Sequence, residues 1–414
     1  MTLGIFIGLF VLYLVLGLLF IPGKNMKPFI VWTVLLPLTP ALTALHTKSQ
    51  ISVYYAFLIL PILFIILMRS DKFKLHRQSV ISLLLLSVII LFYLPLGWLF
   101  NTNESTWIHT LKDLKPLLSL GLAFLFLEWM KAHQLQWNSI FNKTLLKINL
   151  AVTIGFFIVL NKTSFLASVT GDPFYLASQA RYLSLGTYFV IFYLLAKLAS
   201  NQNLSFWELV LVFIPVLLSG NRTILVVLIL LVGINMILSM TNPVLFVKRL
   251  ALVGLGAIAL VAGILLGNPA LRDRIASILN VNQLIDELME RRFSPFIAEL
   301  DTFSWYNYLI GKGIGEPFFI PWFTYRENID DYNIYMDNLY MTLYVKYGLG
   351  MFIVLACLFF FVNRTATNKR FKILVISYFL IMGLTTSFMY QFSFLFVLIL
   401  LGAYTNLPVR KRNI

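Results

Sequence analysis

Arg222 stands where two apolar blocks of the chain meet, next to Ser219 and Gly220. A guanidinium group is always charged and binds phosphate oxygens through two parallel hydrogen bonds. The small neighbours would let a ligand approach closely, and a helix beginning here would offer its N-terminal amides to the same anion. The alternative is an arginine that extends to lipid headgroups and does no chemistry. The residue types therefore indicate an anion site, with headgroup contact left open.

Three further arginines stand where they could meet an anion. Arg181 precedes the apolar block 183–200 and has polar neighbours suited to a sugar or a phosphate, with headgroup contact again the alternative. Arg291 and Arg292 lie in an acidic stretch. Ion pairs four residues apart on a solvated helix would explain at least one of these two. Together with Arg222 they are the cations that could receive an anionic substrate.

A carboxylate and an amide, Asp337 and Asn338, stand at the start of the apolar block 338–362. A carboxylate held at the membrane face beside cations can serve as a general base. Asp and Asn are also residue types that commonly cap the N-terminus of a helix. The sequence therefore leaves two interpretations for Asp337, a base and a helix cap.

The glycine-rich stretch 311–315 is a poor candidate for a nucleotide site. It lacks the Gly-Lys-Ser/Thr ending and the flanking strand and helix of a phosphate-binding loop. A tight turn, in which Gly313 and Gly315 let the backbone approach a ligand, fits the sequence better. Aromatic residues such as Trp305 lie around it. Aromatic rings of this kind suit sugar faces and membrane interfaces equally well.

The sequence offers no credible metal or cofactor site. All four histidines lie outside the acidic stretch, and no Asp-x-Asp pair occurs. The single cysteine, Cys357, excludes an intrachain disulfide and a cysteine metal cluster. We therefore expect chemistry that needs neither a metal nor a cofactor.

The elements that must position these residues are apolar helices. Hydrophobic residues make up 60% of the chain and charged residues 12%, with a mean hydropathy of +0.87. Blocks of about 17–25 apolar residues match the thickness of the hydrocarbon core of a bilayer. We expect an all-α polytopic membrane protein with about 12–13 transmembrane helices, in a single membrane domain over residues 1–414. The expected blocks are 2–22, 28–45, 51–68, 79–100, 114–130, 144–160, 183–200, 205–219, 223–241, 250–267, 338–362, 371–388 and 391–406.

Residues 268–337 break this pattern, with eleven of the seventeen acidic residues against six Lys or Arg. The stretch is too polar for lipid and long enough to fold over a site as a cap. Basic connectors such as 69–77 and 364–372 belong in the cytoplasm by the positive-inside rule, together with the C-terminus. The acidic loop is then external. The net charge of +15 is a topology signal, and no nucleic-acid partner is expected.

The chain resembles the Wzy-type O-antigen polymerases of bacteria and, more broadly, the O-antigen ligase superfamily. Ser219-Gly220-Asn221-Arg222 is similar to that superfamily's Ser-Gly-x-Arg element. Asp337-Asn338-Leu339-Tyr340, followed by Tyr347-Gly348-Leu349-Gly350, is similar to its His-Asn-x-x element and later Gly-Leu-x-Gly. Between these elements, in one large loop, lie Arg292, Trp305 and 309–315, while Arg181 precedes an earlier helix. The resemblance spans roughly residues 170–355.

The resemblance implies a glycosyltransferase of the membrane-embedded C class. A growing glycan would pass from undecaprenyl diphosphate to a lipid-linked repeat unit, at the periplasmic side of the bacterial cytoplasmic (inner) membrane. A chain-length regulator would be a further partner. The implied catalytic residues are Asp337 as the base, with Arg222 and Arg292 stabilising the leaving diphosphate. The implied substrate contacts are Arg181, Arg291, Asn338, Ser219, Gly313, Gly315, Trp305 and Tyr340.

Two other functions remain as alternatives. O-antigen ligases carry histidine where this chain has Asp337, which favours a polymerase and leaves Asn338 as a second candidate for that role. A flippase or transporter of lipid-linked sugars would carry ionisable residues near the middle of the bilayer. The expected helix interiors are nearly uncharged, with Lys115, Glu128 and Glu208 near block ends. This distribution favours an enzyme that acts at the bilayer surface.

Overall fold

The computed structural model describes most of the chain after residue 73 in separate stretches, with a few isolated positions between them. The stretches are 74–100, 107–132, 139–160, 185–200, 205–219, 221–237, 293–320, 332–366, 368–391 and 393–405. They are mostly helical, in agreement with the all-α class expected from the sequence.

Long helices alternate with short connecting elements along the described chain. The longer helices are α5 (Arg77–Phe100), α6 (Trp107–Ala132), α7 (Ser139–Leu160), α9 (Leu185–Ala199), α10 (Phe206–Leu218), α11 (Arg222–Ile237), α18 (Met351–Thr365), α19 (Lys369–Thr385) and α20 (Phe394–Thr405). The shorter elements are α15 (Ser294–Asp301), α16 (Asn307–Ile310), β1 (Phe318–Phe319), β2 (Tyr332–Asn333), α17 (Leu339–Tyr347), η5 (Gly348–Gly350) and η6 (Phe388–Tyr390).

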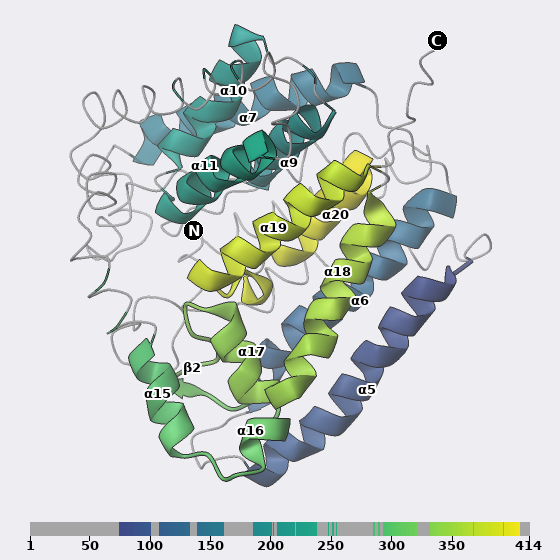
Figure 1. Cartoon of the computed structure of the whole chain (residues 1–414), viewed down its shortest axis with the longest axis vertical. Coiled ribbons are helices and arrows are strands. Elements are labelled where there is room, and N and C mark those ends of the chain that lie inside the picture. Colours follow the sequence, from purple (N-terminus) through teal and green to yellow (C-terminus); the bar gives the residue numbers. More distant parts are fainter. Residues whose placement is uncertain are drawn as a thin grey trace, which may run out of the picture.

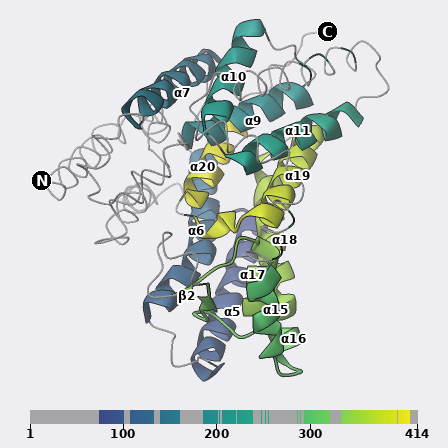
Figure 2. The same cartoon turned by 90° about the vertical axis from the view of Figure 1, so that its left-hand side faces the viewer.

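The helices form two layers, which Figure 1 and Figure 2 show from two directions. In the first layer α6 packs against α5 and α20, and α18 packs against α5 and α19. The second layer holds α7, α9, α10 and α11. Helix α9 packs against both α19 and α20, and α11 packs along α19. The contact between the layers is apolar, as where Phe192 meets Tyr378 edge to face with ring centroids 5.9 Å apart.

The described helices follow the expected apolar blocks closely, with two corrections. Helix α6 begins at Trp107, so Asp113, expected in a connector, is part of the helix. The block 338–362 is two helices, α17 and α18, because the chain turns at Gly348, where φ is 51°. Such a positive φ is open to glycine at little cost. The blocks 2–22, 28–45 and 51–68, and nearly all of 250–267, lie outside the described residues.

Two helical segments in the described chain are long and apolar enough to cross a membrane, Arg77–Phe100 and Leu339–Thr365. The first is the more telling, because its most apolar window has a mean hydropathy of 2.6 and only 28% of that window is buried in the protein. Its exposed side chains include large apolar residues, among them Leu84, Val88, Leu91, Phe92 and Leu99. Water is a poor solvent for such a continuous apolar face.

The acidic stretch folds against one end of the first layer, and its described part (293–320 with 332–338) is called the cap below (Figure 1). Helix α15 packs against α17, and α16 packs against α17 and η5. Strands β1 and β2 pair antiparallel, with Phe318 opposite Asn333, so the all-α expectation needs this small correction. Phe318, Ile320, Met336 and Val345 form a separate small apolar core at this two-stranded sheet.

The opposite end of the first layer carries basic side chains. The Glu128 carboxylate accepts hydrogen bonds from Ser79 Oγ at 2.7 Å and from Arg364 Nε at 2.9 Å. Lys131 Nζ donates to the backbone carbonyl of Arg364 at 2.6 Å. The ends of α5, α6 and α18 that meet here adjoin basic connectors that the sequence analysis placed together on the cytoplasmic side.

Candidate functional site

A single carboxylate, that of Asp113 on α6, ties the cap to the helices beneath it. Its Oδ2 atom accepts hydrogen bonds from Lys346 Nζ at 2.6 Å and from the Gly315 amide at 2.8 Å. Its Oδ1 atom accepts one from the Tyr390 hydroxyl at 2.8 Å. The donors come from α17, from the cap and from η6, so one carboxylate joins three parts of the chain that are distant in sequence.

The partner of Asp113, Lys346, is enclosed as completely as the carboxylate. Both side chains are 0% exposed. The Lys346 ammonium also donates to the backbone carbonyl of Glu316 at 2.8 Å and lies 5.1 Å from the centre of the Phe318 ring. A buried charge is tolerated only when it is paired and hydrogen-bonded. The pair therefore fixes how the cap turn sits on α17.

The glycine-rich turn of the cap packs directly on helix backbone. The Gly313 amide donates to the carbonyl of Lys346 at 2.8 Å, and the Ile314 amide donates to the carbonyl of Tyr93 at 3.0 Å. Gly313 and Gly315 have φ of 94° and 101°, which favour glycine. A side chain at Gly313 would collide with the backbone of α5, and one at Gly315 would collide with Thr110. The space that these glycines leave is filled by protein.

A second charged cluster lies inside the cap. Lys312 Nζ pairs with Glu299 at 2.6 Å and with Glu316 at 3.1 Å. Burial alone would lower the pKa of the Lys312 ammonium, but its pairs with Glu299 and then Glu316 outweigh burial and hold that pKa above its ordinary value. Burial raises the pKa of the Glu316 carboxyl, and Lys312 offsets this only in part. The Glu316 Oε2 atom is buried with no hydrogen-bond partner.

The chain enters α17 through a tightly held turn that contains Asp337 and Asn338. Asn338 is the N-cap residue: its Oδ1 atom accepts a hydrogen bond from the Met341 amide at 3.1 Å, and its Nδ2 atom donates to the carbonyl of Leu384 at 3.2 Å. Asp337 precedes the cap residue and is only partly buried. Helix capping therefore explains Asn338 and does not explain Asp337, whose role as a base remains a prediction.

The elements on either side of Asp337 are fixed to the turn between α19 and α20. Ser387 Oγ donates to the carbonyl of Met336 at 2.5 Å and lies 3.1 Å from Thr342 Oγ1. The ring of Tyr335 stacks on that of Tyr390, with centroids 5.5 Å apart. Because Tyr390 also donates to Asp113, the position of Asp337 depends on the same carboxylate that holds the cap.

Two other predicted contact residues lie in or next to the cap. The Tyr340 hydroxyl donates to the carbonyl of Leu380 at 2.7 Å, which ties α17 to α19. Trp305 is 78% exposed, and its ring meets that of Tyr306 edge to face at 5.8 Å. Trp305 thus lies on the outer surface of the cap, apart from the buried contacts around Asp113.

Ser219 and Arg222 lie in the second layer of helices. Ser219 ends α10, is fully buried, and donates from Oγ to the carbonyl of Val216 at 2.6 Å. Arg222 is the first residue of α11, as expected for a helix that starts at this point. Helix α11 packs along α19, and α19 packs on α17. The helix that begins at Arg222 is thus joined to α17 through α19.

Three of the predicted arginines, Arg181, Arg291 and Arg292, lie outside the described residues, as does Gly220. Among the residues that the structure does describe, no group of three or more His, Cys, Asp or Glu could hold a metal ion. The roles assigned to the three arginines therefore remain predictions.

The sequence analysis missed Asp113, Lys346, Glu316 and Tyr390. The expectation of nearly uncharged helix interiors is wrong at Lys346, which is fully buried within α17. A signal was present, because Lys346 is the only charged residue in the apolar block 338–362. A lone charge in such a block predicts a buried partner. Its partner, 233 positions away, could not be identified from one sequence.

Residues 139–406 match a family described as a family of unknown function (DUF6369). The chain belongs to this family. No curated protein and no solved structure matches the chain. The match to DUF6369 begins at α7 and ends in α20, so it includes the cap, Lys346 and Tyr390 but neither α5 nor Asp113. In this DUF6369 member, the central carboxylate of the buried cluster thus comes from outside the matched region.

Proposed function

We propose that this protein is a membrane-embedded glycosyltransferase that extends a surface polysaccharide. It would transfer a growing glycan from undecaprenyl diphosphate to a lipid-linked repeat unit. The observation that carries the proposal is the placement of the Asp337–Asn338 turn. That turn lies where the cap enters α17, at the end of the apolar helices, and is held there through Asp113 and Tyr390. Substrates with lipid tails require a site at this level, where a sugar can reach it while the tail stays in the bilayer.

The membrane placement rests on α5 and on the charges at the two ends of the first layer. The exposed apolar face of α5 suits lipid, since only 28% of its apolar window is buried. Lys131, Arg364 and Lys369 lie at the end opposite to the cap. With that end in the cytoplasm, the cap faces the periplasm of a bacterial cytoplasmic membrane. We extend this arrangement to the whole chain as about 12–13 spans, on the length criterion for apolar blocks.

The chemistry follows from the residue types. A hydroxyl oxygen of the acceptor sugar attacks the anomeric carbon of the donor glycan, and the bond from that carbon to the diphosphate oxygen breaks. Asp337 takes the hydroxyl proton, and undecaprenyl diphosphate leaves with the electron pair of the broken bond. Arg222 and Arg292, with Arg181, stabilise the charge that develops on the leaving diphosphate. Arginine suits this role because its planar fork binds two phosphate oxygens at once.

The flippase or transporter alternative gains one observation, the buried Lys346–Asp113 pair inside apolar helices. The contacts of that pair favour the enzyme nonetheless. Lys346 and Asp113 are occupied by backbone groups of the cap, the Glu316 carbonyl and the Gly315 amide. A pair that binds the protein itself is a structural clamp, and it offers no vacant group to a passing substrate.

Deletion of the gene in its own host tests the proposed function. Electrophoresis of the surface polysaccharide should show the ladder of chain lengths collapsing to a single repeat unit. Loss of all polysaccharide from its acceptor would instead indicate a ligase or a flippase. Those two differ in the side of the membrane on which the lipid-linked glycan accumulates.

Complementation with Arg222→Ala sharpens this test. Loss of a charge-assisted contact to a diphosphate should lower the rate by about 100-fold, and the ladder should remain collapsed at normal protein levels. Arg222→Lys is the matched control. It keeps the charge without the planar fork, so it should recover little activity. A full ladder from Arg222→Ala would mean that the arginine contacts only lipid headgroups.

A further inference from the structure

The cap continues the apolar surface of the helices beneath it. Trp305 and Leu309 of the cap are 78% and 52% exposed. They adjoin elements whose own apolar side chains are also exposed, and these six residues are called the seat. The seat consists of Trp98 and Leu99 at the end of α5, Trp305 and Leu309 in the cap, and Leu349 and Phe352 where α17 passes into α18.

Direct contacts join the cap to these helix ends. The ring of Tyr306 stacks on that of Phe100, the last residue of α5, with centroids 5.4 Å apart and planes 26° apart. The Tyr344 hydroxyl of α17 donates to the carbonyl of Tyr308 at 3.1 Å. Leu309 lies against Gly348, next to Leu349. The apolar side chains of the seat therefore come from elements that touch one another.

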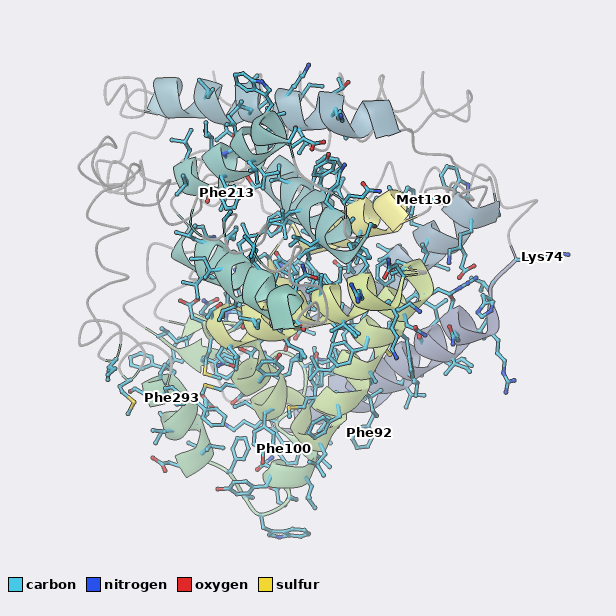
Figure 3. The ribbon with its side chains drawn as sticks, turned by 45° about the horizontal axis from the view of Figure 1, so that its top comes forward. Lys74, Phe92, Phe100, Met130, Phe213 and Phe293 are labelled. Carbon is cyan, nitrogen blue, oxygen red and sulfur yellow. The ribbon has the colours of Figure 1, made fainter. Side chains whose placement is uncertain are left out.

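The position of the seat along α5 indicates how deep in the bilayer the seat lies. A helix of 24 residues is about 36 Å long, slightly more than the ~30 Å hydrocarbon core. Phe100 marks the cap end of that helix and Phe92 lies farther along it, as Figure 3 shows. Because Tyr306 stacks on Phe100, α16 lies at the level where a spanning helix reaches the lipid headgroups.

The composition of the seat matches that level. Tryptophan and tyrosine concentrate at membrane interfaces, where the ring body is apolar and one edge meets water. Leucines beside them suit the boundary between headgroups and acyl chains. Ser304 is an exposed polar neighbour of Trp305 in the chain, but the other elements at this level contribute large exposed apolar side chains, Trp98 and Leu99 from α5 and Phe352 from α18.

We propose that the seat is embedded in the periplasmic interface of the bilayer, so that lipid holds the cap from outside while Asp113 and Lys346 hold it from within. This inference rests on the membrane placement in the proposed function and extends that function by saying what holds the cap. Trp305 then contacts lipid and no sugar. A cap seated in the interface keeps the turn at Asp337 close to the bilayer surface, where both lipid-linked substrates arrive.

Site-directed spin labelling of the whole chain in lipid nanodiscs tests the seat. The background is Cys357→Ala, which removes the single, buried cysteine. Labels are placed with Trp305→Cys and Leu309→Cys in the seat. Thr302→Cys, an exposed polar position of the cap, is the aqueous control, and Leu91→Cys, 74% exposed in mid-α5, is the lipid control. Collision rates with oxygen, which enters lipid, and with a nickel chelate, which stays in water, are compared.

Labels at 305 and 309 should collide with oxygen several-fold more than with the nickel chelate, relative to the label at 302. Their depth should be shallower than that of the label at 91. If 305 and 309 match 302 while 91 is in lipid, the seat is overturned and the membrane placement stands. Low collision with both agents at 305 and 309 would mean burial against protein, which also overturns the seat. A water-accessible label at 91 would overturn the membrane placement itself.

Discussion

Helix α6 carries a carboxylate near each end, and each pairs with a cation from the helical segment α17–α18, but the surroundings differ. At the cap end, Asp113 and Lys346 meet at 2.6 Å with both side chains 0% exposed. At the basic end, Glu128 and Arg364 meet at 2.9 Å, and the Arg364 side chain is 23% exposed. Helix α6 is thus clamped at both ends, to α17 through a fully buried pair and to α18 through a pair whose arginine is partly exposed.

This difference indicates at which end of α6 the loss of one charged partner costs less stability. At the basic end the Glu128 side chain is 3% exposed but water reaches Arg364, so this pair lies between a buried pair and an exposed one, which contributes only about 0.2–1 kcal/mol. At the cap end water cannot enter without moving the cap. Breaking a buried pair from one side costs about 3–5 kcal/mol, because the remaining charge is left without a partner. The cap-end pair therefore selects a single arrangement of cap, α17 and η6.

The largest expected effect comes from breaking the cap-end pair from one side. Asp113→Ala should lower the free energy of unfolding by about 3–5 kcal/mol, since it leaves the Lys346 charge buried and alone. The measurement is the midpoint of thermal unfolding of the purified protein in detergent. The double variant Asp113→Leu with Lys346→Met removes both charges and should recover part of the loss, since the Gly315 amide and the Tyr390 hydroxyl still lack their acceptor. Wild-type stability of Asp113→Ala would show that water reaches this site.

A second carboxylate at the cap end, Asp337, should behave in the opposite way. Asp337→Asn should slow glycan transfer by about 10²–10⁴-fold if its carboxylate takes the acceptor proton, with the unfolding midpoint unchanged. Asn338 already caps α17, so lost capping would not account for the defect. The assay follows extension of purified lipid-linked repeat units. A silent Asp337→Asn together with an inactive Asn338→Ala would transfer the positioning role to Asn338.

The contrast between the two ends also shows what one sequence can reveal. Helix ends such as Arg77 and Ala199 fall close to the expected boundaries because an apolar block needs about 20 residues to cross a bilayer. The turn at Gly348 and the pairing of Lys346 with Asp113 depend on tertiary packing. Neither residue type nor spacing identifies a partner 233 positions away, so the buried half of the candidate site stayed hidden.

At the basic end, a single substitution should have a moderate effect. Arg364→Ala removes two hydrogen bonds to Glu128 but leaves the one from Ser79. We expect a loss of about 1–2 kcal/mol, between the value for an exposed ion pair and that for a hydrogen bond to a buried charge. Arg364→Lys is the control and should recover part of it. A loss as large as that of Asp113→Ala would remove the distinction between the ends.

The smallest change in stability should come from substituting Glu316, whose carboxylate lies near the buried Asp113–Lys346 pair but is not part of it. Its backbone carbonyl accepts from Lys346, and this bond survives in Glu316→Gln. The amide keeps an oxygen for Lys312, which retains its closer pair with Glu299. We expect a change in the free energy of unfolding of about 1 kcal/mol or less at neutral pH, since the Oε2 atom has no partner to lose.

The pH dependence of this variant gives the sharper measurement. Burial raises the pKa of the Glu316 carboxyl, so the folded protein binds its proton more tightly than the unfolded chain does. The stabilisation from that proton is fully present below the unfolded pKa and is lost as pH rises through the folded pKa. Glutamine stays neutral throughout. As the pH is raised from about 4.3, the ordinary pKa of glutamate, the unfolding midpoint of Glu316→Gln should therefore rise relative to that of wild type. A shift in the opposite direction would mean that the Lys312 pair outweighs burial.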